Sequence, residues 1–197
     1  VGGRIISKEV TVEKSLVCSI EDRSGYGLLS FSTTSAVVPY GSNFQTTITL
    51  LDEEYGDFSL WINGQYYETE NGELYFSIPV TESTVFVVES VATHFDYFVN
   101  ATADGLKLKH RACPTKVILP KYSEDGKICS EIYELTLAIG SASIYKNSVM
   151  EELIVPDSYT MIDKNAFRYC TALKTIRLYN TELAALTEAT WGTNKPQ

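Results

Sequence analysis

Apolar residues alternate with polar ones along much of the first half of the chain. The alternation is clearest in four runs, Phe44–Leu50, Phe58–Ile62, Leu74–Val80 and Val85–Val87. A period of two places one set of side chains on one face of a β-strand. We therefore expect residues 1–91 to form short strands whose apolar faces share one core.

Turn-forming residues separate these runs. Asn63-Gly64 and Asn71-Gly72 stand between runs, and Tyr40–Asn43 precede the first of them. Asn-Gly readily adopts the positive φ angles of a two-residue hairpin. Short strands joined by such turns are typical of an antiparallel β-sandwich, which is the predicted fold of residues 1–91.

Three motifs in this block resemble the small β-sandwich repeats of bacterial surface proteins and phage tail proteins. The motifs lie in Gly41–Ile48, Leu60–Gly64 and Gly72–Thr81. The repeats typically read G-x-x-F, then V-x-V-N-G, then G-x-Y-x-I-x-x-V-T. The similarity covers roughly residues 36–90. It implies an Ig-like or similar small sandwich.

Residues 92–115 form a predicted connecting segment. The stretch from His94 to Val99 has the pattern of one further strand, and Ala103–Gly105 has the composition of a turn. Cys113-Pro114 then favours an extended backbone, because the residue before proline avoids the helical region.

The second half contains an internal repeat. Residues 139–155 align without a gap with residues 162–178, at an offset of 23. Val117–Pro120 also echo Leu153–Pro156 and suggest an earlier, divergent copy. Each aligned copy carries an apolar triplet with the spacing L-x-x-L-x-L. The triplets are Met150, Leu153, Val155 and Leu173, Ile176, Leu178.

This spacing predicts a coil that needs neighbours. Its x-L-x-L part is a short strand with alternate residues facing inward, and Ala166–Leu173 are expected to form one or two helical turns on the opposite side. One coil cannot bury its apolar face alone, so copies stack into a solenoid. The residues expected on the exposed side of the strands are Glu152, Ile154, Lys174, Thr175 and Arg177.

The segment Leu153–Leu178 looks like the BspA-type leucine-rich repeat, L-x-I-P-x-S-V-T-x-I-G-x-x-A-F-x-x-C-x-x-L-x-x-I-x-L-P. Tyr159, Asp163 and Tyr179 depart from that pattern, at positions expected on the surface or in loops. The resemblance implies a short, truncated solenoid over residues 116–197. Its inward residues are Met150, Leu153, Val155, Ile162, Ala166, Phe167, Cys170, Leu173, Ile176 and Leu178. The whole chain is thus predicted to be mostly β with short helices (α+β), a sandwich followed by a solenoid.

The earlier copy contains 13 additional residues. Leu119 and Ile139 are 20 positions apart, against 7 for Val155 and Ile162. Residues 122–127 have the composition of a hairpin tip, and insertions in repeats map to loops. We favour an inserted hairpin. The alternative is a shortened repeat made by Ile132, Leu135 and Leu137.

Composition narrows the range of partners. The chain has 197 residues, 44% of them hydrophobic, and a net charge of −9 from 16 basic and 25 acidic residues. The apolar content suffices for a core, while the acidity argues against nucleic acid and anionic lipid. No apolar run approaches the ~20 residues of a membrane span, so direct membrane insertion is not expected. The start at Val1, without a leader pattern, suggests a piece of a longer protein.

The sequence shows no catalytic motif, and we expect no enzyme, cofactor or metal. His94 and His110 lack a triad-like neighbourhood, and the nucleophile elbow, zincin and P-loop patterns are absent. Asp52–Glu54 with Asp57 indicate a solvated turn rather than a cation site. A disulfide between Cys113 and Cys129 is possible, although buried thiols are favoured.

Aromatic residues supply the one candidate binding site. Trp61 lies opposite the Phe58/Leu60/Ile62 face of its strand, with Tyr66 and Tyr67 after the turn. An exposed group of this kind would suit sugar rings or a protein partner. The alternative is that this face is the packed one.

Three functions are weighed. The leading hypothesis is a non-enzymatic binding or adhesion segment of a larger cell-surface or secreted bacterial protein, because BspA-type repeats occur in surface proteins that bind host or matrix proteins. Its ligand would be a protein or a glycan. The alternatives are a phage tail or receptor-binding segment in a virion, and an accessory module of a secreted enzyme.

Overall fold

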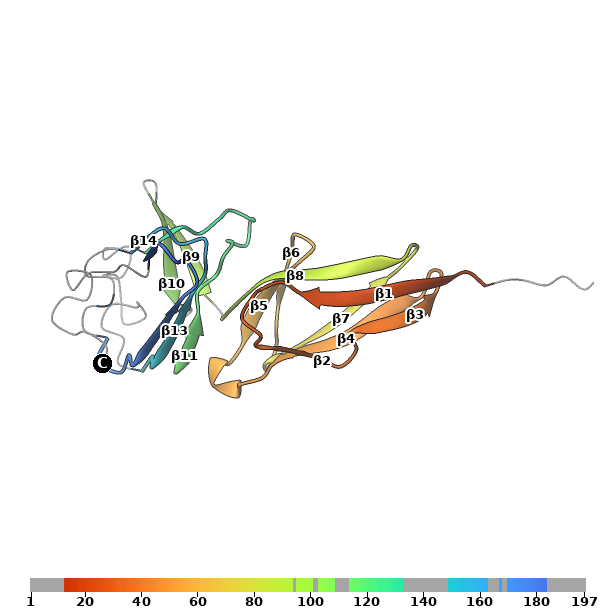
Figure 1. The fold of residues 1–197 in the computed structure, drawn as a ribbon, viewed down its shortest axis with the longest axis horizontal. Coiled ribbons are helices and arrows are strands. Elements are labelled where there is room, and N and C mark those ends of the chain that lie inside the picture. Colours follow the sequence, from red (N-terminus) through yellow and green to blue (C-terminus); the bar gives the residue numbers. More distant parts are fainter. Residues whose placement is uncertain are drawn as a thin grey trace, which may run out of the picture.

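The computed structural model describes residues 13–93, 95–100, 103–108, 114–132, 149–162, 167 and 170–183. It is mostly β, with several sheets, and the described residues contain almost no helix beyond the short 3-10 turn η1 (Glu53–Tyr55). Two parts of the chain lie end to end along the long axis (Figure 1). The prediction of a β-rich fold is confirmed. Of Ala166–Leu173, where helical turns were expected, the structure describes residues 167 and 170–173, and none of these is helical.

The first part contains two sheets. One has the order β3-β1-β8-β5-β6 and the other the order β2-β4-β7. Contrary to the all-antiparallel prediction, β1 and β8 pair in parallel. The strands are β1 (Ser15–Asp22), β2 (Leu29–Phe31), β3 (Ser35–Pro39), β4 (Asn43–Leu50), β5 (Phe58–Ile62), β6 (Gln65–Glu68), β7 (Glu73–Pro79) and β8 (Thr84–Thr93).

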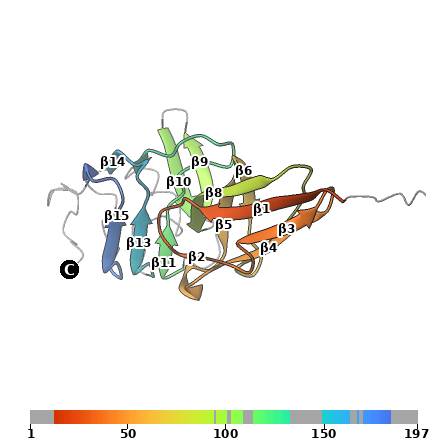
Figure 2. The same cartoon turned by 45° about the vertical axis from the view of Figure 1, so that its right-hand side comes forward.

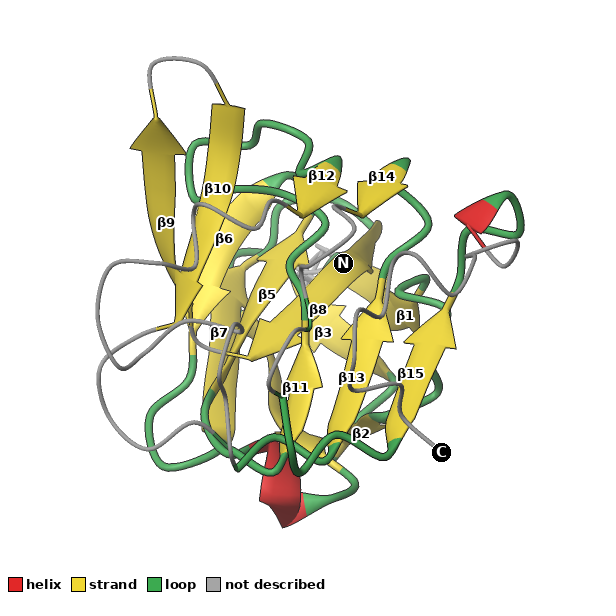
Figure 3. Cartoon of the chain, turned by 90° about the vertical axis from the view of Figure 1, so that its left-hand side faces the viewer, coloured by secondary structure: helices red, strands yellow, loops and turns green. Residues whose placement is uncertain are grey.

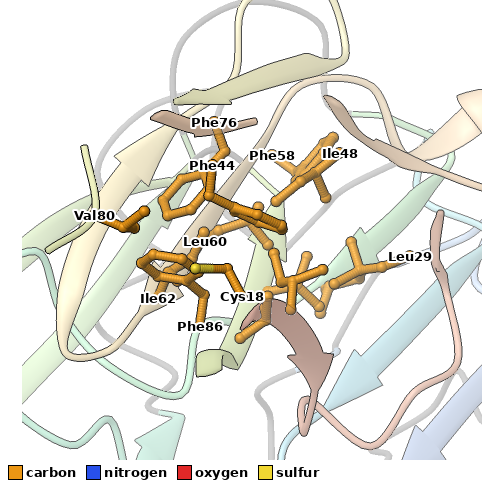
Figure 4. Packing of buried hydrophobic residues seen from close by; sticks show 14 of the residues in the cluster. Cys18, Leu29, Phe44, Ile48, Phe58, Leu60, Ile62, Phe76, Val80 and Phe86 are labelled. Atoms are coloured by element: carbon orange, nitrogen blue, oxygen red, sulfur yellow. The ribbon is translucent and has the colours of Figure 1, made fainter. Parts of the chain in front are cut away.

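Both sheets contribute side chains to one core (Figure 4). Phe44 of β4 stacks on Phe86 of β8 with ring centroids 5.3 Å apart. Phe76 of β7 meets Phe86 edge-on at 5.1 Å. Aromatic pairs of this geometry add to the stabilisation that burial alone supplies. Two sheets therefore enclose a common apolar interior, while the finer assignment to a β-sandwich stays a prediction.

The predicted Asn-Gly turns form as expected. Asn63 and Gly64 have φ angles of 49° and 73° and close the hairpin of β5 and β6. Asn71 and Gly72, with φ of 56° and 76°, also form a tight turn. This second turn joins strands of different sheets, because β6 and β7 are not paired.

The inward face of β8 differs from the expected one. Alternation pointed to Val85 and Val87, but Phe86 and Val88 are the buried residues, and Val85 is exposed. All four residues are apolar, so no polar residue among them marks the outer face. Pairing with β1 and β5 decides which face is inward.

A two-stranded antiparallel sheet follows. It consists of β9 (Phe95–Asn100) and β10 (Ala103–Leu108) (Figure 3). The first strand was expected, whereas the turn predicted at Ala103–Gly105 is wrong. These residues begin β10, paired with Asn100, Val99 and Phe98. The boundaries predicted for the three domains stay predictions.

The second part contains three parallel strands, β11 (Lys116–Ile118), β13 (Glu152–Val155) and β15 (Thr175–Leu178), in that order side by side (Figure 2). Leu153 pairs with Ile176 at the 23-residue offset of the sequence alignment. Val117 pairs with Leu153, 36 residues away. This offset exceeds the repeat offset of 23 by the 13 additional residues of the earlier copy. The proposed alignment is therefore confirmed as strand pairing over Glu152–Val155, whereas Ile162 pairs with Ile132 and not with the aligned Ile139.

The additional residues include the predicted hairpin. Tyr122 and Ile128 form an antiparallel bridge, and the Ser123 amide donates to the Lys127 carbonyl oxygen at 2.8 Å. After this hairpin, β12 (Glu131–Ile132) pairs in parallel with β14 (Met161–Ile162). Residues 133–148 lie outside the described residues, so the shortened-repeat alternative is not tested.

The inward residues of the repeat form a second core. Met150, Leu153, Val155 and Phe167 are fully buried, and Ile162, Cys170 and Leu173 nearly so. The cluster thins at β15, where Ile176 and Leu178 are only partly buried. Ala166 lies outside the described residues.

Tyr159 was expected at the surface or in a loop, and this expectation is wrong. Its side chain is fully buried in the second core. The hydroxyl donates a hydrogen bond of 3.0 Å to the carbonyl oxygen of Pro120. A buried phenol needs such a partner, and the sequence pattern does not reveal that Pro120 supplies one.

Candidate interaction surfaces

The predicted aromatic platform is not an open surface. Trp61 is 2% exposed, and Tyr66 and Tyr67 are half-buried. The Trp61 ring lies 5.0 Å from the ring of Tyr66 and 6.3 Å from that of Tyr122. The prediction of an exposed platform is therefore wrong, and the alternative, that this face of β5 is the packed one, is confirmed. Strand β5 is buried on both faces, and the inserted hairpin, which contributes Tyr122, lies far along the chain from Trp61.

Some of the polar atoms around Trp61 have hydrogen-bond partners and others do not. The Tyr66 hydroxyl donates to Glu68 at 2.8 Å and lies 3.0 Å from the Ser59 hydroxyl, and burial raises the pKa of Tyr66. The indole N–H of Trp61 and the hydroxyl of its neighbour Ser90 are buried with no hydrogen-bond partner in the described part of the chain. These side chains thus form an internal cluster rather than a binding platform.

Two isoleucines join the parts of the chain. Ile118 of β11 and Ile154 of β13 are 0% and 1% exposed and belong to the core of the first part. Thr93, at the end of β8, donates its hydroxyl to the Ile118 carbonyl oxygen at 3.1 Å and accepts the Ile118 N–H at 3.2 Å. The expectation that Ile154 is exposed is therefore wrong, because the first part covers the outward side of these strands.

Lys116 strengthens this joint. Its ammonium group forms ion pairs with Asp52 and, at 2.9 Å, with Glu54. Asp52 also accepts the Glu54 amide N–H at 3.0 Å. The hydrogen bond from Lys116, and then that amide, lower the pKa of Asp52. The acidic turn, expected to be merely solvated, thus contacts the second part.

The outer face of the three-stranded sheet is a separate surface, which we call the Tyr75 face. It lies on the side of the first part away from β1 and β8 (Figure 1). Tyr75 of β7 is 63% exposed and stands opposite Thr47 of β4. The outward positions around it are Ser30, Asn43, Gln45, Thr49, Glu73, Ser77 and Pro79. The alternation of Leu74, Phe76 and Ile78 was the signal that placed Tyr75 outward.

A hollow of about 450 Å³ adjoins one end of the Tyr75 face. Thr49 and Glu73 belong to both, and Asp57 and Asn71 also line the hollow. Asp57 accepts the amide N–H of Gly72 at 2.7 Å. The carboxylate of Asp57 is thereby held beside the tight turn.

The five-stranded sheet presents an apolar outer face. Val17 and Val37 are paired neighbours on β1 and β3 and are 62% and 69% exposed. Val85 of β8 is exposed on the same sheet. The two outer faces of the first part therefore differ in chemistry, one being apolar and the other polar with a single aromatic ring.

The remaining candidates take no part in a described site. His94, His110 and Cys113 lie outside the described residues, so the disulfide from Cys113 is not tested. Cys170 is buried in the second core, as predicted. Among the described residues, no group of three His, Cys, Asp or Glu side chains is placed to hold a metal ion. The described chain also contains no helix with the length and apolar content to cross a bilayer.

Comparisons with known proteins identify no relative. No protein-family model, no curated protein and no solved structure matches this chain. Both family resemblances stay predictions that rest on the residues quoted above.

Proposed function

We propose that this chain is a non-enzymatic binding or adhesion segment of a larger cell-surface or secreted bacterial protein. Its second half would be a BspA-type leucine-rich repeat solenoid and its first half a small β-sandwich. Its ligand would be a host or matrix protein or a glycan. The observation that carries the proposal is the parallel pairing of β13 and β15 at the offset of the sequence repeat.

This pairing supports the proposal because stacked repeats share one continuous core and leave an extended outer surface for ligands. Here Ile118 and Ile154 use part of that surface to dock the first half. Thr175 and Arg177 of β15 remain exposed. The joint holds the two halves together, so that ligand-facing surfaces of both keep a defined relative position.

The test is a binding screen with the purified chain. The probes are a glycan array and wells coated with fibronectin, fibrinogen, laminin or collagen. We expect saturable binding to at least one of them. The control is the double variant Phe44→Asp/Leu153→Asp, which places a charge in each of the two cores and unfolds both parts. Absence of saturable binding, or equal binding by the unfolded control, would refute the proposal.

A further inference from the structure

We propose that the Tyr75 face binds a neutral oligosaccharide, with the ring of Tyr75 as a stacking platform. The amides and hydroxyls beside it act as hydrogen-bond partners. This inference deepens the proposed binding role and rests on it, because it names the ligand class and the surface.

The exposed ring is the first reason. On the outward positions of the described strands β2, β4 and β7, Tyr75 is the one large apolar side chain, and it is 63% exposed. A flat aromatic ring offers a rigid apolar face with a polar hydroxyl at its edge. The C–H face of a sugar ring packs on such a surface, while the sugar hydroxyls point to the polar surroundings.

The polar neighbours are the second reason. Asn43 donates its side-chain N–H to the Ser77 hydroxyl at 2.9 Å, and Gln45 does so at 3.4 Å. These contacts hold both amides beside Tyr75, on the neighbouring strand. Each amide has a second N–H and a carbonyl oxygen with which to bind sugar hydroxyls.

Charge selects a neutral ligand. The outward positions of these strands carry one charged side chain, Glu73, and it is acidic. The whole chain has a net charge of −9. A sulfated or carboxylated glycan would find no cation among these outward positions and would be repelled by the field of the protein.

The dimensions favour a chain of several sugars. Four outward positions of β4, from Asn43 to Thr49, extend over about 20 Å at the usual rise of a strand. Beyond Thr49 the face opens into the hollow of about 450 Å³. Asp57, Asn71 and Glu73 line this hollow and supply acceptors for the several hydroxyls of a terminal sugar.

A protein ligand suits this face less well. Protein interfaces centre on clusters of buried apolar and aromatic residues, and here one ring is surrounded by polar side chains. The apolar face with Val17 and Val37 has the chemistry for that kind of contact. We therefore assign the saccharide to the Tyr75 face.

The experiment is calorimetric titration with cellohexaose, xylohexaose, mannohexaose and maltohexaose. The proteins compared are the wild type, Tyr75→Ala, Tyr75→Phe and a control, Val37→Ala, which shortens an exposed side chain on the opposite sheet. We expect at least one hexasaccharide to bind. Tyr75→Ala should weaken binding by about tenfold or more, equivalent to about 1.4 kcal/mol. Val37→Ala should bind like the wild type, Tyr75→Phe should retain more affinity than Tyr75→Ala because it keeps the ring, and thermal melts should show that all variants fold.

The outcomes separate this inference from the proposed function. If a matrix protein binds but none of these hexasaccharides does, the inference is wrong and the proposed function stands. If a hexasaccharide binds equally well to Tyr75→Ala, the assigned surface is wrong. If neither sugars nor matrix proteins bind, both proposals are overturned.

Discussion

Replacing Ile154 by alanine tests whether the two parts of the chain fold as one unit. Ile154 stands on the outward side of β13, where a repeat strand alone would expose it. In the structure it is 1% exposed and packs in the core of the first part. The replacement therefore removes buried carbon atoms from the joint.

A buried Ile154 and an exposed Ile154 predict different losses in the free energy of unfolding. Shortening a buried isoleucine to alanine costs about 2–5 kcal/mol, because apolar burial is lost and a cavity remains. The same change at an exposed position costs within about 0.5 kcal/mol. The matched control is Thr175→Ala, an exposed residue on the neighbouring strand β15, for which we expect the small value.

Urea denaturation followed by tryptophan fluorescence measures the difference. Trp61 is buried beside Tyr122 of the second part, so its emission responds when the joint opens. Replacing Trp191 by Phe in every variant leaves Trp61 as the fluorophore. We expect Ile154→Ala to lower the urea midpoint with little change in slope. If its cost is as small as that of Thr175→Ala, the joint does not stabilise the fold and the reasoning is wrong.

Three further predictions concern single side chains. The hydrogen bond from Lys116 lowers the pKa of Asp52, so this carboxylate stabilises the fold above its usual pKa of 3.8 and loses that effect as the pH falls through the lowered value. Asp52→Asn should therefore flatten the acid limb of a plot of melting temperature against pH. An unchanged limb would contradict the ion pair. Trp61→Ala should lower the free energy of unfolding by about 3–5 kcal/mol. Trp61→Phe should lower it far less, because the indole N–H that it removes has no partner in the described chain. Equal losses for the two variants in urea melts would show that the N–H is hydrogen-bonded. Tyr159→Phe removes the hydrogen bond to Pro120. It should lower the free energy of unfolding by about 1–3 kcal/mol in a urea melt, because a buried acceptor is left unpaired. An unchanged free energy would mean that this hydrogen bond contributes nothing to stability.

Local patterns predicted much of the β structure. The alternation in Phe44–Leu50 identified β4 and its inward face, because the backbone of a strand alone sets the period of two. Asn63-Gly64 identified a hairpin because these residues tolerate positive φ. The 23-residue repeat predicted the register of β13 and β15, whose equivalent residues pair at this offset.

Partners distant in the chain decided what local patterns left open. Val85 to Val88 are all apolar, so pairing with other strands selected the inward pair. Lys116 reaches Asp52 and Glu54 across the joint. The sequence around the acidic turn contains no pattern that predicts its pairing with Lys116, more than sixty positions later.

At the candidate binding surface, too, the sequence predicted the direction of the side chains and the tertiary structure decided their exposure. Alternation placed Trp61 outside the core of its own sheet, and the sequence alone put forward Trp61, not Tyr75, as the candidate platform. The tertiary structure reversed that order: Tyr122 of the inserted hairpin lies against Trp61, whereas Tyr75 stays 63% exposed. A strand determines which way its side chains point, but exposure depends on what else packs there, and that is a property of the assembled fold.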